Sequence, residues 1–479
     1  MKRRQAKFAA DRNLPQLAQA LDATSMKPAL QGFFRREYPG RSLQVQRVNI
    51  GKIYHKPGKN CEITYGVRCR DGGKKIHSMW FQAKMPVNGK DLAAEPRTWP
   101  GCGFWKPVSV WPEMNMVLYA FPYDRRLPYL GQLLEMEWIK QQVERHWANF
   151  GLPAGAKCQE VVCEKIKYMP GKRCVLRYEI KLAGLRQKKV FYGKTYNDTQ
   201  SRYVFQALQA ICASPACSDG RLNVPAPIAH LDEANTIWQH AWESDDLNVV
   251  MQKKIGWVNF PRTDFPNKIA TMLAALHQID ITAESGRSAE RSRSELQRGP
   301  SSKAVLLNAG GDASDIARFF PEKQEALAEM IGALEKFAPD MAAAPQTTIH
   351  GSFKLAQLLC RAERSRSDQQ LGLIDFDSVA CGDPLYDVAE FVASLAFLKV
   401  SDEIPAPPID ESIELYLASY QRQVPWNCDR RRLAWYVAAF LLGKIHASLK
   451  RREAKGVANI HLAFLLVQEW INIITRRSL

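Results

Sequence analysis

The pattern of apolar and polar positions predicts strands in the first half of the chain and helices in the second half. From Tyr54 to about residue 250, short runs of alternating apolar and polar residues are separated by turn-forming pairs such as Pro-Gly, which is typical of β-strands. After Ile255, apolar residues recur every three or four positions, as on the buried face of a helix. The segments with helical spacing are 267–279, 314–337, 383–398, 410–423, 430–449 and 460–475. Two short apolar runs, 347–353 and 371–377, lie between them and are predicted strands.

A five-residue pattern in the strand-rich half occurs twice. Each copy predicts two strands joined by a Pro-Gly turn, followed by a third strand with one lysine, Lys84 in the first copy and Lys194 in the second. The copies are 113 residues apart, since 170 minus 57 is 113: Pro57, Gly58, Lys59, Cys61 and Tyr65 match Pro170, Gly171, Lys172, Cys174 and Tyr178. We expect a duplicated β-rich module; the alternative is a chance similarity between two hairpins.

Composition narrows the class of protein. The chain has 479 residues, of which 46% are hydrophobic, enough for more than one core. Its 11 cysteines are scattered without CxxC pairs, which favours a reducing, cytoplasmic location. The most apolar run, 433–449, contains Lys444 and His446 and is too short to span a bilayer, so we expect no membrane insertion.

The net charge of +17 favours anionic partners such as nucleotides. Lysine and arginine are nevertheless spread along the chain, and no zinc-finger, RRM or basic-helix pattern accompanies them. We therefore expect no nucleic-acid partner, and solvated basic faces are the simpler interpretation of the charge.

A motif in the second half points to a specific chemistry. "HGSFKLAQLL" begins at His350, and "LIDFDSVACGDPLYDVAEF" begins at Leu373. Together they resemble the aminoglycoside phosphotransferase and choline kinase-like family, whose loop reads HGDxxxxxN, followed by a strand that ends in IDxx and then by GDPxxDxA. The resemblance covers about Cys158 to the C-terminus. It implies a kinase-like fold and phosphoryl transfer from ATP.

Phosphoryl transfer requires metal ions on the phosphates, and the resemblance assigns Asp375 to Mg²⁺. Asp377 lies two residues further on and would project to the same face if the strand continued. Gln357 stands at the asparagine of the family motif, and its amide oxygen is a further candidate ligand. The alternative role for the two aspartates is capping. Asp383 and Asp387 we assign to structure, because Asp383 precedes a helix start.

The resemblance implies basic residues for the nucleotide. Lys194 matches the lysine that pairs with the α- and β-phosphates, although an edge lysine with its amine in water is an equal alternative. The helix predicted at 199–214 carries no acidic residue to pair with it. Lys172 and Arg173 lie at the tip of a predicted hairpin. Their side chains either contact the phosphates or are simply solvated. His350 matches the first residue of the loop and is also placed in the cofactor site.

The loop departs from the family at its catalytic aspartate, where this chain has Ser352. A serine hydroxyl cannot accept a proton at neutral pH, and loss of a general base costs roughly 10²–10⁴ in rate. Lys354 matches a lysine that protein kinases carry in the same loop, where it holds the γ-phosphate. The catalytic candidates are therefore Ser352, Lys354 and Asp377, with Asp377 or water as the replacement base.

These observations predict an α+β protein with a bilobal, protein kinase-like fold preceded by a duplicated N-lobe-like module. We expect the extra module at 1–140, the kinase-like N-lobe at 141–250 and a helical C-lobe at 251–479. The first hypothesis is an ATP- and Mg²⁺-dependent phosphotransferase that acts on a small hydroxylated acceptor. The alternative is a pseudokinase that binds nucleotide and regulates or scaffolds. Residues 40–130 of the extra module are a candidate surface for a protein partner.

Overall fold

The computed structural model describes residues 11–86, 102–152, 157–183, 188–281, 297–340, 344–361, 370–453 and 458–476, apart from the side chain of Lys254. The chain divides into two compact units. Unit 1 comprises Met1–Thr199, Leu231–Thr236 and Lys450–Glu453, and unit 2 comprises Gln200–His230, Ile237–Leu449 and Ala454–Leu479. The predicted three-part division by residue number stays a prediction.

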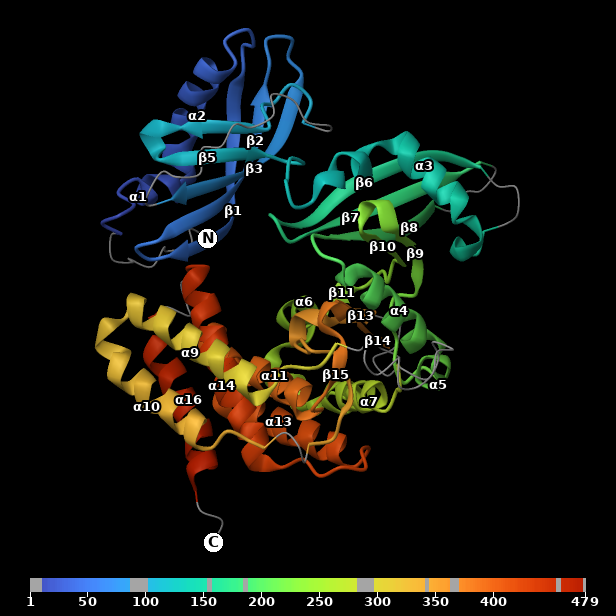
Figure 1. The fold of residues 1–479 in the computed structure, drawn as a ribbon, viewed down its shortest axis with the longest axis vertical. Coiled ribbons are helices and arrows are strands. Elements are labelled where there is room, and N and C mark those ends of the chain that lie inside the picture. Colours follow the sequence, from blue (N-terminus) through green and yellow to red (C-terminus); the bar gives the residue numbers. More distant parts are fainter. Residues whose placement is uncertain are drawn as a thin grey trace. The chain divides into compact units, whose positions relative to one another are not determined.

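The first part of unit 1 is a helix-covered antiparallel sheet (Figure 1). The helix α2 begins after Asp22, whose carboxylate accepts hydrogen bonds from the backbone N–H groups of Thr24 and Ser25, as an N-cap does. Among the described residues the strand order is β1-β2-β3-β5-β4. The elements are α1 (Leu17–Ala20), α2 (Ala23–Glu37), β1 (Gln44–Lys56), β2 (Asn60–Arg70), β3 (Ile76–Pro86), β4 (Val108–Trp111) and β5 (Met116–Ala120).

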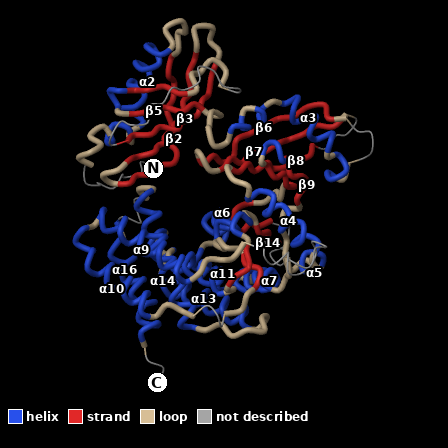
Figure 2. Tube along the Cα trace, viewed as in Figure 1, coloured by secondary structure: helices blue, strands red, loops and turns tan. Residues whose placement is uncertain are grey.

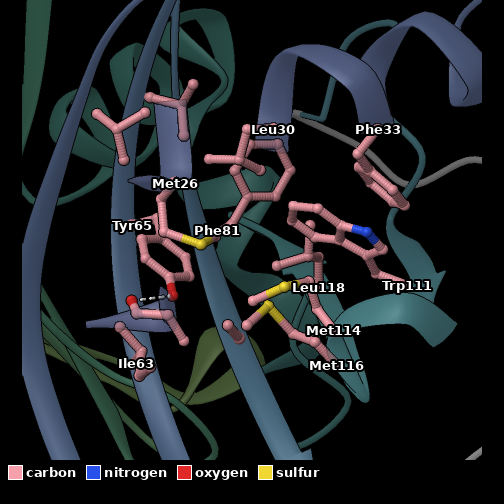
Figure 3. Close-up of a cluster of buried hydrophobic side chains, with 14 of the residues drawn as sticks. Met26, Leu30, Phe33, Ile63, Tyr65, Phe81, Trp111, Met114, Met116 and Leu118 are labelled. Carbon is pink, nitrogen blue, oxygen red and sulfur yellow. Dashed lines mark hydrogen bonds between the residues drawn. The ribbon is translucent and has the colours of Figure 1, made fainter. Parts of the chain in front are cut away.

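Apolar side chains of α2 and of the sheet form the core of this first module (Figure 3). Met26 and Leu30 of α2 are fully buried, as are Ile63 and Tyr65 of β2. Burial of each such side chain contributes roughly 1.5–3 kcal/mol. The cluster draws its members from Leu14 to Tyr123. The first module therefore has a core of its own.

The second module repeats the first in strand order, helix position and side-chain contacts. Among the described residues its sheet has the order β6-β7-β8-β10-β9. Tyr65 of the first module donates a hydrogen bond to the carbonyl of Ala20 (2.6 Å), and Tyr178 of the second donates to the carbonyl of Leu133 (2.8 Å). The donor and the acceptor residue of the second bond each lie 113 positions after those of the first. The elements are α3 (Met136–Arg145), β6 (Cys158–Met169), β7 (Arg173–Leu182), β8 (Lys188–Tyr196), β9 (Pro227–Leu231) and β10 (Thr236–His240). The expected duplication is confirmed.

The Pro-Gly turn of each module is held by an aspartate from the segment that precedes it. Asp11 Oδ2 accepts a hydrogen bond from the backbone N–H of Gly58 (3.0 Å). Asp124 Oδ2 accepts one from Gly171 (2.6 Å) and another from the hydroxyl of Tyr168 (2.9 Å). Both glycines have positive φ angles, 69° and 65°, which glycine adopts without strain.

Unit 2 is mainly helical (Figure 2). Its helices are α4 (Gln200–Ala213), α5 (Pro215–Ser218), α6 (Leu247–Val250), α7 (Phe265–His277), α9 (Ser302–Phe319), α10 (Gln324–Lys336), α11 (Leu385–Ala396), α12 (Leu398–Ser401), α13 (Ala406–Gln421), α14 (Arg430–Lys450, which ends in unit 1) and α16 (Ile460–Thr475). The prediction of one continuous helix over residues 314–337 is wrong. The chain breaks at Pro321, which has no N–H to donate and which starts a short 3₁₀ turn.

Two small sheets complete unit 2. In the described part of the chain, β11 (Asp245–Asp246), β13 (Leu358–Arg361) and β14 (Gln370–Leu373) form one sheet, and β12 (Thr347–Ile349) pairs with β15 (Ala380–Gly382). Both predicted strands are present, but they belong to different sheets. No described helix is both long and apolar enough to cross a membrane.

Candidate active site

The segment that carries the HGS motif follows β12 and is held by Asp387 of α11. The backbone N–H groups of His350 and Gly351 donate to the two carboxylate oxygens of Asp387, at 2.5 and 2.9 Å. Asp387 is fully buried, and its Oδ2 also lies 3.2 Å from Nε2 of His277. The side chain of Asp387 therefore fixes the shape of the loop, which agrees with the structural role expected for it.

Gly351 is required by this shape. Its φ angle is 73°, in the left-handed region that other residues avoid. A Cβ atom at this position would lie 2.1 Å from the carbonyl oxygen of Ser378. Close approach of the loop to the segment after Asp377 thus depends on the missing side chain.

His350 lies inside the protein rather than at its surface. Its side chain is fully buried, with Nε2 3.1 Å from the carbonyl oxygen of Ile374 and its ring 4.8 Å from that of Phe376. Burial lowers the pKa of His350, which favours the neutral imidazole. This placement ties the loop to the strand that ends before Asp375. A contact of His350 with nucleotide stays a prediction.

Ser352 and Lys354 contact each other directly. Lys354 Nζ donates a hydrogen bond to Ser352 Oγ over 3.0 Å. The same Nζ lies 3.9 Å from Oε1 of Glu390 on α11. The loop position that carries an aspartate in the family therefore presents a hydroxyl beside an ammonium group.

The candidate metal ligands gather where the loop meets the end of β14. Gln357 Nε2 donates to Asp375 Oδ2 over 3.2 Å, and the backbone N–H of Ile374 donates to the carbonyl of Gln357 over 3.0 Å. Asp377 is buried nearby in the chain, within the one-turn 3₁₀ helix Phe376–Ser378. The structure thus brings the predicted loop residue Gln357 to Asp375.

The strand does not continue through Asp377, so the argument that strand alternation puts both carboxylates on one face is wrong. Asp375 adopts a left-handed backbone conformation, with φ 72° and ψ 52°, which ends the extended segment before the 3₁₀ turn. Strand alternation applies only to extended backbone. Any shared orientation of the two carboxylates must come from this turn instead.

The donor set still suits magnesium. Mg²⁺ is typically held by one or two carboxylates together with substrate phosphates, and Asp375 and Asp377 supply carboxylates. As oriented here, Gln357 offers its nitrogen to Asp375, so it orients that carboxylate. Across the described residues, no group of three or more His, Cys, Asp and Glu side chains is placed to hold a metal ion. Phosphate oxygens of a bound nucleotide would supply further ligands to a Mg²⁺ ion at Asp375.

The predicted nucleotide-binding lysines lie in unit 1, whereas the loop residues lie in unit 2. Lys194 is on β8, where it pairs with Val175 of β7, and Lys84 of the first module pairs with Glu62 in the equivalent register. Lys172 and Arg173 follow Gly171 at the β6–β7 turn. Asn197 ties this turn to the end of β8, because its side chain donates to the carbonyl of Gly171 over 2.8 Å.

Two residues of the site were missed by sequence reasoning. Gln200, the first residue of α4, donates from Nε2 to the backbone carbonyl of Asp377 over 2.6 Å. Glu390 reaches Lys354 from α11. The spacing of Glu390 was a usable signal, because residues three apart lie on the same side of a helix and Asp387 was already identified. Nothing in the sequence pattern marks Gln200, which donates to this backbone carbonyl and to the side chain of Gln297.

A family model matches the part of the chain that carries the loop. Residues 200–436 match the family described as "Phosphotransferase enzyme family". A comparison with curated proteins finds no match.

Comparison with solved structures finds distant likenesses among kinases. Choline kinase from Cryptosporidium parvum Iowa II has 12% sequence identity and a TM-score of 0.44, over 70% of this chain and 95% of that one. Ethanolamine kinase from Plasmodium vivax has 11% identity and a TM-score of 0.39, over 65% and 82%. Wild-type aminoglycoside 2'-phosphotransferase-IIIa in complex with GDP has 14% identity and a TM-score of 0.39, over 68% and 98%. At these values the three structures are distant likenesses.

The fold is α+β and kinase-like, with a β-rich module ahead of the matched region. Residues 200–436 of this chain are similar to the phosphotransferase enzyme family.

Proposed function

We propose that this protein is an ATP- and Mg²⁺-dependent phosphotransferase that acts on the hydroxyl group of a small cytoplasmic compound. Asp375 and Asp377 hold the metal ion, and Gln357 orients Asp375. Lys194, Lys172 and Arg173 bind the phosphates, and Lys354 approaches the γ-phosphate. The bound Mg²⁺ would neutralise charge on the β- and γ-phosphates.

The observation that carries this proposal is the held loop. Asp387 binds two consecutive N–H groups of the loop, and Gln357 at the other end of the loop binds Asp375. A loop fixed at both ends keeps its side chains in place before any ligand arrives, and catalysis of phosphoryl transfer consists mostly of such positioning and of charge stabilisation.

The second candidate is a pseudokinase that binds nucleotide without transferring phosphate. Ser352 favours it, because this hydroxyl accepts a hydrogen bond from Lys354 and has no capacity to take a proton from an acceptor alcohol. Both candidates require the same metal and nucleotide contacts. They differ only on the acceptor side of the site.

Calorimetric titration with ATP, with and without Mg²⁺, tests nucleotide binding. We expect binding that depends on Mg²⁺ and that weakens at least about tenfold in Asp375→Ala, because the metal loses a carboxylate. Asp410→Ala is the matched control, since Asp410 is exposed on α13 and pairs with Lys399. Absence of binding by the unaltered protein would contradict both candidates.

Ser352→Asp separates the two candidates. If the missing base limits phosphate transfer, restoring a carboxylate should raise Mg²⁺-dependent ATP turnover by roughly 10²–10⁴. Release of labelled phosphate from γ-labelled ATP measures this. A variant that binds ATP as tightly as the unaltered protein yet stays inactive would favour the pseudokinase.

We further propose that residues 40–130 form a surface for a protein partner, rather than for nucleic acid, and that the kinase-like N-lobe follows this module. The first module has its own core and, among the described residues, its own five-stranded sheet, which supports a separate role for it. A chain that lacks residues 1–122 retains Asp124, which holds the turn at Gly171. Unchanged nucleotide affinity and solubility of this chain would count against a role for the module in the site.

A further inference from the structure

A carboxylate outside the family motif lies beside the catalytic loop. Glu390 follows Asp387 by three positions on α11, so both side chains leave the same side of this helix. Asp387 binds the backbone of the loop. Glu390 contacts a side chain of the loop, because its Oε1 lies 3.9 Å from Nζ of Lys354. One helix face thus brings two carboxylates to the loop.

The hydrogen bond between Lys354 and Ser352 fixes what each group can do. An ammonium group only donates, so Ser352 Oγ is the acceptor and its own hydrogen remains to be donated elsewhere. Neither side chain in these forms can accept a proton from an alcohol. A proton acceptor for the reaction must therefore come from another residue or from water.

Glu390 has the surroundings of a usable base. Its side chain is 13% exposed, and burial raises its pKa, as does Asp387 on the same helix. Lys354 from the loop and Lys444 from α14 act in the opposite direction and favour the ionised form. A carboxyl group whose pKa is raised toward neutrality is a more effective general base than an ordinary one. The simpler role for Glu390 is neutralisation of the two lysines.

We propose that Glu390 replaces the absent loop aspartate as the proton acceptor of phosphoryl transfer. This inference rests on the proposed phosphotransferase function. The oxygen of the acceptor hydroxyl forms a bond to the γ-phosphorus, and the bond from that phosphorus to the bridging oxygen breaks, with its electron pair leaving on ADP. The hydroxyl proton passes to the Glu390 carboxylate, directly or through one water molecule. Lys354 stays charged and keeps the transferred phosphate beside Ser352.

Mg²⁺-dependent hydrolysis of ATP, with water as the acceptor, tests this proposal in four proteins: the unaltered chain, Glu390→Gln, Ser352→Asp and the double variant. We expect Glu390→Gln to lower kcat by about 10²-fold or more with little change in KM, because a base acts in the transition state. The Ser352→Asp variant already has a carboxylate in the loop. Adding Glu390→Gln to it should therefore change kcat by less than about threefold. A structural role for Glu390 would instead reduce kcat in both backgrounds equally and would overturn the proposal.

The pH profile gives a second readout. The ionised carboxylate is the active form, so kcat of the unaltered chain should fall as pH drops through the raised pKa of Glu390. Glu390→Gln should lack this limb of the profile, whereas Glu411→Gln, an exposed change on α13, should keep it. The groups that face Glu390 are Lys354, Lys444, Asp387 and Tyr386, so their substitution would shift the limb without removing it.

Binding measurements separate failure of this inference from failure of the proposed function. If the unaltered chain does not bind Mg²⁺ and a non-hydrolysable ATP analogue, the proposed function itself is wrong. If it binds the analogue and Glu390→Gln hydrolyses ATP at the unaltered rate, only the role of Glu390 is wrong. If the unaltered chain binds the analogue but hydrolyses ATP no faster than the Glu390→Gln variant does, the role of Glu390 is wrong as well.

Discussion

At the scale of single residues, the loop is held by a few buried hydrogen-bonding groups. The Asp387 carboxylate receives two backbone N–H groups and contacts His277, which in turn is 2.6 Å from the hydroxyl of Tyr420. A buried carboxylate with several donors is stable only as a complete network, because each donor left without an acceptor costs roughly 1–3 kcal/mol. The loop therefore has one well-defined conformation.

Gly351→Ala should damage this conformation. The new Cβ would lie 2.1 Å from the Ser378 carbonyl oxygen, and the backbone is left-handed at that residue, so we expect a loss of at least about 2 kcal/mol in the free energy of unfolding together with weaker Mg²⁺-dependent ATP binding. Urea unfolding and calorimetry measure the two effects. Gly310→Ala in α9 is the control, because nothing lies within 4 Å of its added Cβ. This control should be stabilising by about 0.5–1 kcal/mol.

At the scale of elements, the second module repeats the first down to single hydrogen bonds. In both modules a buried tyrosine of the second strand holds the carbonyl of a residue that precedes the covering helix. The strand registers match as well. Lys84 pairs with Glu62 and Lys194 pairs with Val175, and these two partners are 113 positions apart. The two modules should therefore respond alike to equivalent substitutions.

Tyr65→Phe and Tyr178→Phe test this equivalence. Each change removes a hydroxyl and leaves one buried carbonyl oxygen without its donor, so each should lower the free energy of unfolding by about 1–3 kcal/mol. Urea unfolding of the two variants and of Tyr129→Phe, an exposed control, measures the cost. A large loss in one variant and none in the other would contradict equal roles for the two tyrosines.

Sequence reasoning predicted most elements because their apolar spacing is regular, as in α7 and α14. It failed at Pro321, where helical spacing continues across a residue that interrupts the helix. In the candidate site, the loop and Asp375 were predicted from motifs, and the structure brings Gln357 of the loop to Asp375. The contacts of Gln200 and Glu390 were not found, because they depend on tertiary packing between elements that are distant in the sequence. The left-handed backbone of Asp375 was not predicted either.

At the scale of the whole chain, a contact within unit 1 links β6 of the second module to β3 of the first. Lys165 of β6 lies with its Nζ 3.5 Å from the centre of the Trp80 ring of β3 and 5.5 Å from that of Phe121. Burial lowers the pKa of Lys165 to about 8. The lysine is therefore partly desolvated by residues of the other module.

Trp80→Ala should raise the pKa of Lys165 toward the ordinary value of about 10.4, because it removes much of this burial. In the unaltered protein the unfolded chain binds this proton more tightly, so the free energy of unfolding should rise as pH increases from about 8 to about 10.4. The alanine variant should show a smaller rise. NMR titration of the lysine and urea unfolding across this pH range measure both effects, and an unchanged pKa would contradict the contact.

The closed core of the first module also bears on synthesis of the protein at the ribosome. Two sheets with the same strand order in one chain create a hazard, because a strand of one copy can insert into the other during folding. The core of the first copy ends at Tyr123, before α3 and the strands of the second copy have been translated. The first copy can thus complete its sheet while its competitor does not yet exist, so the order of translation itself keeps the two sheets from exchanging strands.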